Sequence, residues 1–326
     1  MSLPLQVGLL VVSVLGLGLG ARALVDSVVR LARRVGLSEL TIGLTVVAVG
    51  TSTPELVVTL DAASVGAGGI AVGNVVGSNI YNLAFVLGVV SLVRVVPVER
   101  SLLHRDGLAL LASTLVGAAV LLDLTVTRAE GALLFALFVG YTGYLLWGSA
   151  REQSASDGGT TGTGDPLTTN LTERIAFRGR DAALLVGGLA VVLVSGHFMV
   201  ESASAIARIA GLSEALIGGT IVAAGTSTPE FAVSLVAIRR GSLGVSVGNV
   251  VGSNVFNVLA VLGLGALVRP LTAGPGTLEN VAWLVGIVVV TVVALWSGRK
   301  LSRAEGGLFA GSEVVRWTLG LLGLVG

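Results

Sequence analysis

The chain has no cysteine among its 326 residues and only two histidines, His104 and His197. The lack of cysteine excludes disulfide bonds and thiolate metal sites, and it removes the usual sequence clue to the redox compartment. Neither histidine lies in the polar motifs described below, and a lone histidine of this kind is more often a solvated or packing residue. We therefore expect no enzyme activity and no cofactor.

Charged residues are also scarce. They make up 12% of the chain, against about 25% in a typical soluble domain. Hydrophobic residues make up 53%, and the mean hydropathy is +0.94. Apolar stretches near 20 residues, which match the thickness of the hydrocarbon core, recur along the chain. The net charge of +1 gives no reason to expect a nucleic-acid partner. The composition predicts an all-α membrane protein with ten transmembrane helices, at approximately residues 5–25, 40–61, 70–93, 107–123, 130–149, 182–200, 215–238, 245–268, 281–297 and 306–325.

Residues 43–94 are repeated at residues 218–269. The offset is 175 throughout, without a gap, and 30 of the 52 aligned positions are identical. Five predicted spans lie in each half of the chain. Because five is an odd number, the second copy enters the membrane from the opposite side, and we predict two inverted five-helix repeats. Residues 1–150 form the first repeat and residues 181–326 the second. A linker rich in Gly, Thr and Ser joins them at residues 151–180.

Basic residues predict the orientation. If both chain ends lie outside, the inside segments hold sixteen Lys and Arg residues and the outside segments hold three, while Arg316 falls within the last span. The positive-inside rule then predicts a cytoplasmic linker in a multi-pass protein of the plasma membrane.

Each repeat places polar residues at mid-membrane. The motif GTSTPE occurs at residues 50–55 and 225–230, and GNVVGSN occurs at residues 73–79 and 248–254. Residues four apart share a helix face. This spacing pairs the threonine and glutamate of the first motif, and it pairs the serine of the second motif with the asparagine four residues after it. The paired residues are Thr51 with Glu55, Ser78 with Asn82, Thr226 with Glu230, and Ser253 with Asn257.

Proline and glycine in these motifs predict local geometry. Pro54 and Pro229 have no N–H, so we expect the carbonyls of Gly50 and Gly225 to lose their helical partners. Such carbonyls are tolerated at membrane depth where they line a cavity. The small residues four apart in GNVVG predict that the third span lies close to the second, and that the eighth span lies close to the seventh.

All of the donors in this polar cluster are oxygens. Oxygen ligands, several of them neutral, favour Ca²⁺ or Na⁺ over zinc or copper, and Mg²⁺ gives up its waters reluctantly. Two carboxylates supply two negative charges, which balance one Ca²⁺ or two Na⁺. An ionised glutamate at the bilayer centre costs about 3 kcal/mol, and a bound cation offsets that cost. The alternative is that both glutamates are protonated and only bond neighbouring helices.

At these motifs the chain resembles the cation/calcium antiporter superfamily and, within it, the prokaryotic sodium/calcium exchangers. The resemblance covers the full length, with GTSxPE and GNxxGSNxxN in both repeats. It implies Ca²⁺ extrusion driven by Na⁺, alternating access, and a gate formed by the first and sixth spans. Ca²⁺, Na⁺ and the lipid bilayer are the partners it implies, with no obligate protein partner.

The resemblance also implies a ligand set by motif match. Glu55 and Glu230 would be the principal shared ligands. Hydroxyl or carbonyl oxygens would come from Thr51, Ser52, Thr226 and Ser227, further ligands from Ser78, Asn82, Ser253 and Asn257, and carbonyl ligands for Na⁺ from Ala48 and Ala223.

Asn257 departs from the family pattern, because well-known sodium/calcium exchangers carry aspartate at this position. Proton/calcium exchangers of the same superfamily often carry asparagine there, but they lack the Thr-Ser-x-Pro stretch that this chain has twice. We therefore favour Na⁺ as the driving ion and keep H⁺/Ca²⁺ exchange as an alternative. A cation channel built from the same oxygens is a further one. Asp61, at the end of the second span, is expected either to tune ion access at the outer mouth or to anchor the helix at the interface.

Overall fold

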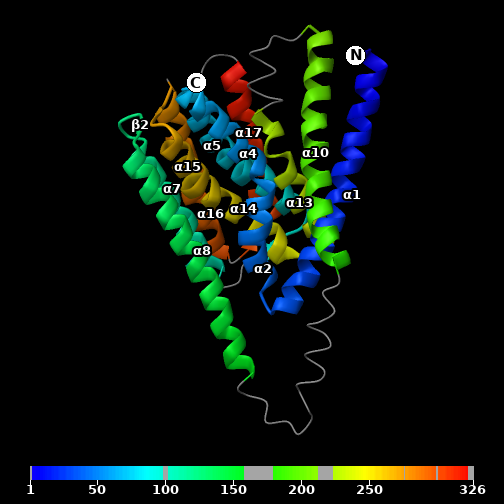
Figure 1. The fold of residues 1–326 in the computed structure, drawn as a ribbon, viewed down its shortest axis with the longest axis vertical. Coiled ribbons are helices and arrows are strands. Elements are labelled where there is room, and N and C mark those ends of the chain that lie inside the picture. Colours follow the sequence, from blue (N-terminus) through cyan, green and yellow to red (C-terminus); the bar gives the residue numbers. More distant parts are fainter. Residues whose placement is uncertain are drawn as a thin grey trace.

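The computed structural model describes residues 2–97, 102–157, 179–211, 223–274, 276–298 and 300–321. Most of these residues lie in helices that run side by side as one bundle (Figure 1). The start of α1 (Leu3–Val35) and the end of α17 (Arg303–Leu321) lie at the same end of the bundle. The end of α8 (Arg128–Asp157) lies at the opposite end.

The elements of the first half follow one another with short connections. They are α1, α2 (Glu39–Ile42), the π-helical turn η1 (Gly43–Val47), α3 (Ala48–Thr51), α4 (Thr53–Ser64), α5 (Gly68–Tyr81), η2 (Asn82–Val86), α6 (Leu87–Val93), β1 (Val96–Pro97), η3 (Leu102–Gly107), α7 (Leu108–Val120), β2 (Thr125–Val126) and α8.

The second half follows the same order, but α2, η1 and η3 have no counterpart among its described elements. They are α10 (Gly179–Ile209), α12 (Ala223–Gly225), α13 (Thr228–Arg239), α14 (Leu243–Phe256), η5 (Asn257–Val261), α15 (Leu262–Val268), β3 (Leu271–Thr272), α16 (Thr277–Gly298), β4 (Lys300–Leu301) and α17.

The described residues contain six helices that are long and apolar enough to cross a membrane, or seven if the bent pair at residues 39–64 is one span. The sequence predicts ten. The difference has physical reasons, because α7 is only 13 residues long and α17 carries Glu313 and Arg316 within its length. The predicted span at residues 215–238 lies partly outside the described residues. The count of ten remains a prediction.

The second predicted span is broken at Ser52. Its two parts, Glu39–Thr51 and Thr53–Ser64, are bent by 46°. The break follows from Pro54, which lacks the N–H that would continue the ladder of the preceding turn. Ser227, immediately before α13, has a similar backbone conformation, with φ of −88° and ψ of 10° against −83° and 13° at Ser52.

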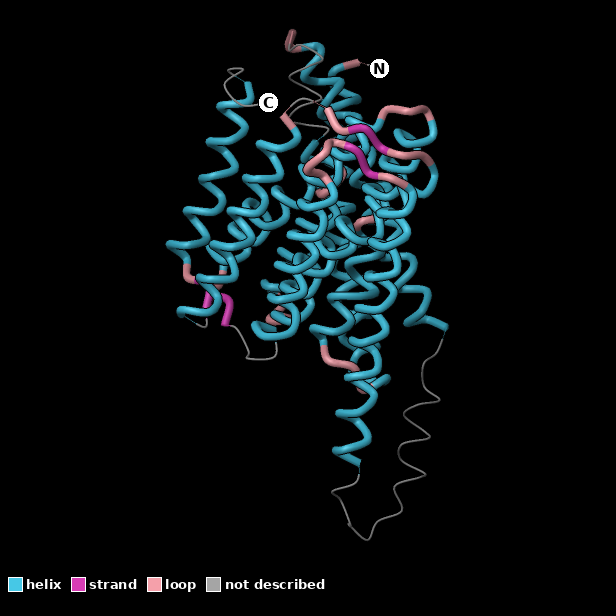
Figure 2. The backbone as a smooth tube through the Cα atoms, turned by 90° about the vertical axis from the view of Figure 1, so that its left-hand side faces the viewer, coloured by secondary structure: helices cyan, strands magenta, loops and turns pink. Residues whose placement is uncertain are grey.

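Two short strand pairs lie at opposite ends of the bundle (Figure 2). In the first, β1 pairs antiparallel with β4, and Val96 faces Leu301. In the second, β2 pairs antiparallel with β3, and Val126 faces Leu271. Adding 175 to Val96 gives Leu271, and adding 175 to Val126 gives Leu301. The two pairs therefore use equivalent positions of the two halves.

Equivalent capping boxes begin α8 and α17. The Glu130 carboxylate accepts the Thr127 hydroxyl at 2.7 Å and the Thr127 N–H at 2.8 Å. The Glu305 carboxylate accepts the Ser302 hydroxyl at 2.6 Å and N–H at 2.7 Å. Each box satisfies orphan donors at a helix start. The same capping chemistry thus recurs at the offset of 175, outside the two copies that the sequence comparison aligned.

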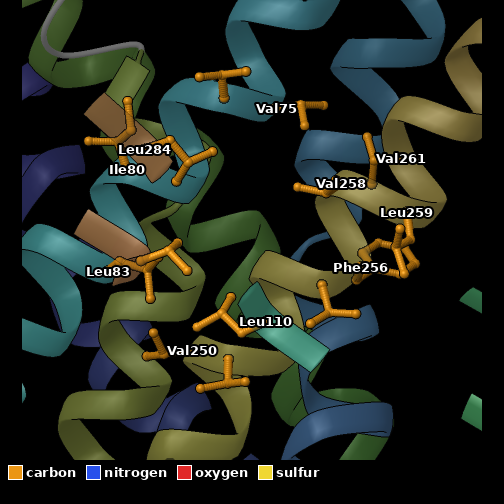
Figure 3. Packing of buried hydrophobic residues seen from close by; sticks show 14 of the residues in the cluster. Val75, Ile80, Leu83, Leu110, Val250, Phe256, Val258, Leu259, Val261 and Leu284 are labelled. Carbon is orange, nitrogen blue, oxygen red and sulfur yellow. The ribbon is translucent and has the colours of Figure 1, made fainter. Parts of the chain in front are cut away.

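The interior of the bundle is filled by branched aliphatic and aromatic side chains. Figure 3 shows part of this cluster, in which Ile80 and Leu83 from the first half lie among Val250 and Val258 from the second. All four are at most 4% exposed. This cluster therefore holds elements of both halves together.

Glycines on α14 allow the closest helix contact in the interior. A β-carbon added at Gly248 would lie 2.7 Å from the Leu40 carbonyl oxygen, and one at Gly252 would lie 2.5 Å from the Leu44 carbonyl oxygen. The prediction of close approach is thus correct for the second copy of GNVVG, although the contact is with α2 and η1 rather than α13. In the first copy α5 also lies close to α4, since Asn74 donates to the Glu55 carbonyl at 3.0 Å, but an added β-carbon at Gly73 or Gly77 meets no described atom within 4 Å.

This difference predicts opposite outcomes for two equivalent substitutions. We expect Gly252→Ala to destabilise the protein by about 1–3 kcal/mol, the usual cost of overpacking against atoms that cannot move aside. Gly77→Ala is the matched control, and we expect it to be neutral or slightly stabilising, because alanine is the better helix former. Thermal melting in detergent, followed by tryptophan fluorescence, measures both. Equal melting temperatures would contradict the contact.

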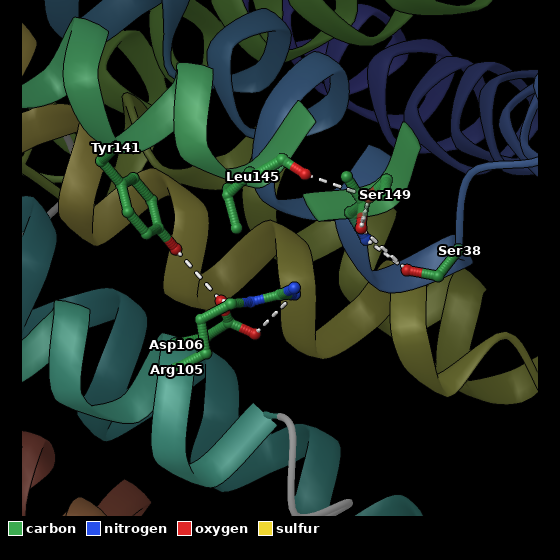
Figure 4. Close-up of polar contacts among 7 residues, drawn as sticks. Ser38, Arg105, Asp106, Tyr141, Leu145 and Ser149 are labelled. Atoms are coloured by element: carbon green, nitrogen blue, oxygen red, sulfur yellow. Dashed lines mark hydrogen bonds and ion pairs between the residues drawn. The ribbon is translucent and has the colours of Figure 1, made fainter. Parts of the chain in front are cut away.

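A polar contact joins α2 to α8 near the end of the bundle that carries β1 and β4. Thr41 Oγ1 of α2 lies 3.2 Å from Ser149 Oγ of α8 and 2.9 Å from Ser38 Oγ. Figure 4 shows Ser149 next to Ser38, and shows the neighbouring contact in which Tyr141 donates to Asp106. Thr41 and Ser149 are both buried. We name the Thr41–Ser149 contact the inner latch.

Candidate cation-binding site

The two copies of GTSTPE meet at the centre of the bundle. The Ser52 hydroxyl donates to Glu230 Oε1 at 2.7 Å, and the Ser227 hydroxyl donates to Glu55 Oε1 at 2.9 Å. These four side chains have no exposed surface. Each glutamate is thus bonded by a serine of the other half.

Local backbone structure explains where the carboxylates lie. Glu55 is in the first turn of α4 and Glu230 is in the first turn of α13, each preceded by a proline at the helix start. Proline suits this position because its missing N–H is not needed there. The positive end of each helix dipole favours the ionised carboxylate. The bend at Ser52 therefore places both charge and hydroxyl at the site.

The prediction of a free carbonyl at Gly50 is wrong. The Thr53 hydroxyl donates to the Gly50 carbonyl oxygen at 2.8 Å and so replaces the N–H that Pro54 lacks. Thr228, the equivalent residue, donates instead to the carbonyl of Ala224 at 3.3 Å. The fourth residue of GTSTPE therefore donates to a backbone carbonyl in both copies, a role that sequence reasoning did not assign.

Two asparagines that sequence reasoning did not select brace the glutamate backbone. Asn74 Nδ2 donates to the Glu55 carbonyl at 3.0 Å, and Asn249 Nδ2 donates to the Glu230 carbonyl at 3.3 Å. Each asparagine also donates, at 3.0 Å, to a hydroxyl one turn after the glutamate on the glutamate's helix. Asn74 donates to Thr59 in this way, and Asn249 donates to Ser234. The signal was present in the sequence, because this asparagine is the second residue of GNVVGSN in both copies.

Three further asparagines join the two halves directly. Asn79 Nδ2 donates to the Asn254 carbonyl at 3.1 Å, and Asn257 Nδ2 donates to Asn79 Oδ1 at 3.1 Å. Asn257 begins the π-helical turn η5 and Asn82 begins the equivalent turn η2. Such turns are frequent at functional sites. Nothing in the sequence pattern predicted them.

Ser78 and Ser253 hold equivalent positions. The Ser253 hydroxyl donates to Glu230 Oε1 at 3.4 Å. Ser78 lies beside Glu55, and its hydroxyl has no hydrogen-bond partner among the described residues. Both serines therefore face a carboxylate.

Several buried oxygens at this place have no hydrogen-bond partner among the described residues. Most buried polar atoms in proteins are paired, so each of these needs an explanation. They are Glu55 Oε2, Glu230 Oε2, Ser78 Oγ, Thr226 Oγ1, Asn82 Oδ1 and Asn257 Oδ1.

The two threonines of the motifs are equivalent in sequence but differ in structure. Thr51 Oγ1 donates to Asn249 Oδ1 at 3.0 Å, whereas Thr226 Oγ1 lacks a described partner. Thr226 instead lines a cavity of about 300 Å³ together with Asn74 and Ser78. The site is thus closed on the side of Thr51 and reached by a cavity on the side of Thr226.

The two alanines expected as carbonyl ligands are less informative. The Ala48 carbonyl accepts the Ser52 N–H at 3.0 Å and the Thr51 hydroxyl at 3.4 Å, so it lies at the helix bend beside the site. Ala223 is the first residue of α12, and its side chain lies outside the described part of the chain.

Two residues that the sequence singled out lie away from the site. Asp61 is exposed near the end of α4, away from the helix bend at Ser52. The His197 side chain is 75% exposed, and its Nε2 lies 4.0 Å from Glu201 Oε2. The His104 side chain lies outside the described residues.

The donor chemistry of the site is uniform. Its ligand candidates are carboxylate, hydroxyl and amide oxygens, and the two carboxylates are close enough to repel one another electrostatically. Across the described ranges there is no group of three or more His, Cys, Asp or Glu side chains able to hold a metal. The arrangement suits a hard cation that neutralises two carboxylates and replaces the missing hydrogen-bond partners.

Comparisons with known proteins agree with this chemistry. The family described as sodium/calcium exchanger protein matches residues 5–147 and 181–312. The putative antiporter CaxA of Alkalimonas amylolytica is 36% identical over 85% of this chain and 86% of that protein. The sodium/calcium exchanger MaX1 of Methanosarcina acetivorans is 30% identical over 88% of this chain and 90% of that protein.

A solved structure of the sodium-calcium exchanger NCX_Mj, soaked with 2.5 mM Na⁺ and 10 mM Sr²⁺, has the same fold. It superimposes with a TM-score of 0.81 at 29% identity, over 96% of this chain and 98% of that one. The chain is therefore a member of the sodium/calcium exchanger family, a group of membrane exchangers.

Proposed function

We propose that the chain is a secondary active antiporter that exchanges Ca²⁺ for Na⁺ at the site formed by Glu55 and Glu230. The observation that carries the proposal is the set of buried oxygens without hydrogen-bond partners around these two carboxylates. A cation bound there would contact oxygens that otherwise remain unsatisfied. Inert packing does not account for so many acceptors in one place. The relatives MaX1 and NCX_Mj, both named as sodium/calcium exchangers, support the same ions.

The ligand set proposed for the ions combines both halves. Glu55 and Glu230 supply the charge. The neutral oxygens come from Thr51, Ser52, Ser78, Asn82, Thr226, Ser227, Ser253 and Asn257, with the carbonyls of Ala48 and Ala223 assigned to Na⁺. Because Asn257 is neutral, the site carries two negative charges, which balance one Ca²⁺ or two Na⁺.

The proposed architecture is ten transmembrane helices in two inverted repeats, residues 1–150 and 181–326. Its main support is the strand pairs: β1 and β3 hold equivalent positions but lie at opposite ends of the bundle (Figure 2). An equivalent element at the opposite end is what inversion produces. The matching capping boxes support a duplication that extends through α8 and α17.

The proposed orientation in the plasma membrane has both chain ends outside and the linker at 151–180 in the cytoplasm. The starting end of α1 and the final turn of α17 lie at one end of the bundle, which supports two chain ends on one side. The end with β1 and β4 would then be the inner end, and the end with β2 and β3 the outer end. The basic residues of the inner segments favour this assignment.

The difference between the two halves supports alternating access. The inner half of the bent span, at Thr51, is bonded to Asn249 and packs on Gly248 and Gly252. The equivalent contact of Thr226 with Asn74 is absent among the described residues. Thr226 and Asn74 line the cavity instead. We infer an outward-facing state, from which closing the Thr226 side and opening the Thr51 side would expose the ions to the cytoplasm.

Proton-driven Ca²⁺ exchange is the second candidate, and the neutral Asn257 is the observation that favours it. Its Nδ2 donates to Asn79 Oδ1, so its Oδ1 is the atom left to face an ion. An amide oxygen in this role needs no proton to be neutral, and Na⁺ uses such oxygens readily. We therefore retain Na⁺ as the driving ion. A cation channel is less well supported, because the cavity reaches the site from one side.

The test is ⁴⁵Ca²⁺ uptake by reconstituted vesicles under separately imposed gradients. Vesicles loaded with Na⁺ and diluted into Na⁺-free buffer are expected to accumulate Ca²⁺, and collapsing the Na⁺ gradient with an ionophore is expected to abolish uptake. Protein-free vesicles are the control. Uptake that follows an imposed pH gradient and ignores Na⁺ would replace the sodium mechanism with the proton one. Sustained currents without any counter-ion would favour a channel.

A further inference from the structure

The last helix carries an ion pair within its length. In α17, Arg316 donates to the Glu313 carboxylate through Nε at 2.8 Å and through Nη2 at 2.6 Å. The Glu313 side chain is 1% exposed and that of Arg316 is 20% exposed. Nη1 of Arg316 also donates to Asn280 Oδ1 at 3.4 Å. Ionisable residues inside a membrane span are costly, and they mark functional positions by default.

The pair borders the cavity that leads to the glutamates. Glu313 and Arg316 line the same space of about 300 Å³ as Ser78 and Thr226, whose hydroxyls have no described hydrogen-bond partner. Tyr81, another lining residue, is within electrostatic range of both Glu313 and Glu230. The ion pair therefore lies close to the site, along the route by which an ion would reach it.

This cavity belongs to the end of the bundle assigned as the outer one. A β-carbon added at Gly68, at the start of α5, would lie within 2.7 Å of backbone atoms of Thr272 in β3, so α5 starts at that end. The cavity residues Ile70 and Asn74 follow within the next two turns. An effect of the pair is therefore expected on the outer face alone.

The helix contact does not require the ion pair. The positions equivalent to Glu313 and Arg316 at the offset of 175 are Phe138 and Tyr141 in α8. There Tyr141 makes the neighbouring polar contact by donating to Asp106 at 3.3 Å. A buried ion pair adds little net stability over well-packed neutral residues. The charges occur in the half whose helix borders the cavity, which points to a role in ion access.

We propose, building on the exchange function proposed above, that Glu313 and Arg316 set the affinity with which the outer face admits cations. Glu313 attracts an arriving cation. Arg316 is a positioning residue, which holds the Glu313 carboxylate at the cavity wall and cancels most of its charge. The balanced pair lets cations pass without trapping them at the mouth, whereas an unbalanced charge of either sign would change the concentration of cations next to Glu230.

The proposal predicts shifts whose direction follows the sign of the charge left behind. Glu313→Gln leaves the positive charge of Arg316, so the KM for Ca²⁺ at the outer face should rise about tenfold or more. Arg316→Gln leaves the negative charge of Glu313, so that KM should fall severalfold. For Na⁺ each shift should be about the square root of the Ca²⁺ shift, because the interaction energy scales with the charge of the ion. The double variant should return both values to within about threefold of the unmodified protein.

The experiment measures Ca²⁺ uptake against Ca²⁺ concentration in right-side-out and inverted membrane vesicles of the full chain. Opposite shifts for the two single variants at the outer face, with unchanged KM at the inner face, support the proposal. Shifts in the same direction, or equal shifts at both faces, would overturn it and leave a structural role for the pair. Detergent melting temperatures identify variants that fail to fold, and the double variant tests charge when a single one is unstable. If the unmodified protein shows no Na⁺-driven uptake, it is the proposed function that fails.

Discussion

Replacing Glu55 with glutamine is expected to lower Na⁺-driven Ca²⁺ uptake to the level of protein-free vesicles, and Glu230→Gln is expected to do the same. Glutamine keeps the size of the side chain and can still accept from Ser227 or Ser52. It removes one of the two charges that balance the ion. Leaving a buried charge without its partner costs about 3–5 kcal/mol, which corresponds to at least a hundredfold loss of binding.

The control for this pair is Glu201→Gln. Glu201 is also a glutamate on a long apolar helix, but its side chain is 56% exposed and its Oε2 lies 4.0 Å from His197 Nε2. It should transport normally. Because the substitutions at Glu55 and Glu230 relieve repulsion between two buried carboxylates, the melting temperatures of those variants should be unchanged or higher. Near-normal uptake by either variant would refute the site assignment.

The second large effect is expected from locking the inner latch. Thr41→Cys and Ser149→Cys replace two hydroxyl oxygens that lie 3.2 Å apart, and a disulfide there would tie α2 to α8. Because alternating access requires the inner part of the bent span to leave its neighbours, oxidation should remove at least nine-tenths of the exchange activity. Reduction should restore it. The chain has no native cysteine, so no other thiol confuses the result.

The matched control is the pair Ser38→Cys and Thr41→Cys. These hydroxyls are 2.9 Å apart, and their disulfide would lie within the first turn of α2 without joining it to α8. Oxidation of this pair should leave exchange intact. Cross-linking is measured by the loss of thiols that react with a maleimide reagent, and activity by Ca²⁺ uptake. Full activity in completely oxidised Thr41→Cys/Ser149→Cys protein would mean that the inner latch persists through the transport cycle.

Much of the site could be predicted from the sequence, because polar residues are conspicuous in an apolar chain. Glu55 and Glu230 could be chosen because a buried charge needs a reason, and the repeat offset of 175 residues pairs them with each other. The family assignment followed from the same motifs and is confirmed by the match over residues 5–147 and 181–312. The cytoplasmic linker and the ten spans remain predictions.

Other features could not be predicted because they depend on tertiary contacts. Helical spacing pairs Thr51 with Glu55, but it cannot reveal that Ser52 crosses to Glu230. The π-helical turns at Asn82 and Asn257 leave no pattern in the sequence. Identical motifs also cannot express a difference between the halves. Gly77 and Gly252 have the same neighbours in sequence, and within the described ranges only Gly252 is pressed against another helix.

The crossed serine bonds bear on how such a protein can have arisen. Ser52 donates to the glutamate of the other half, and Ser227 does the same in return. In a single ancestral copy the serine could not have donated to its own glutamate, so a second copy was needed to supply the donor. On the inverted arrangement proposed here, that ancestor had to insert in both directions and pair with itself before the gene duplicated. Fusion through the linker then placed both copies in one gene, where their sequences could diverge separately. Asn249 accepts from Thr51, whereas Asn74 lacks the equivalent contact with Thr226 among the described residues, although both halves keep the glutamate.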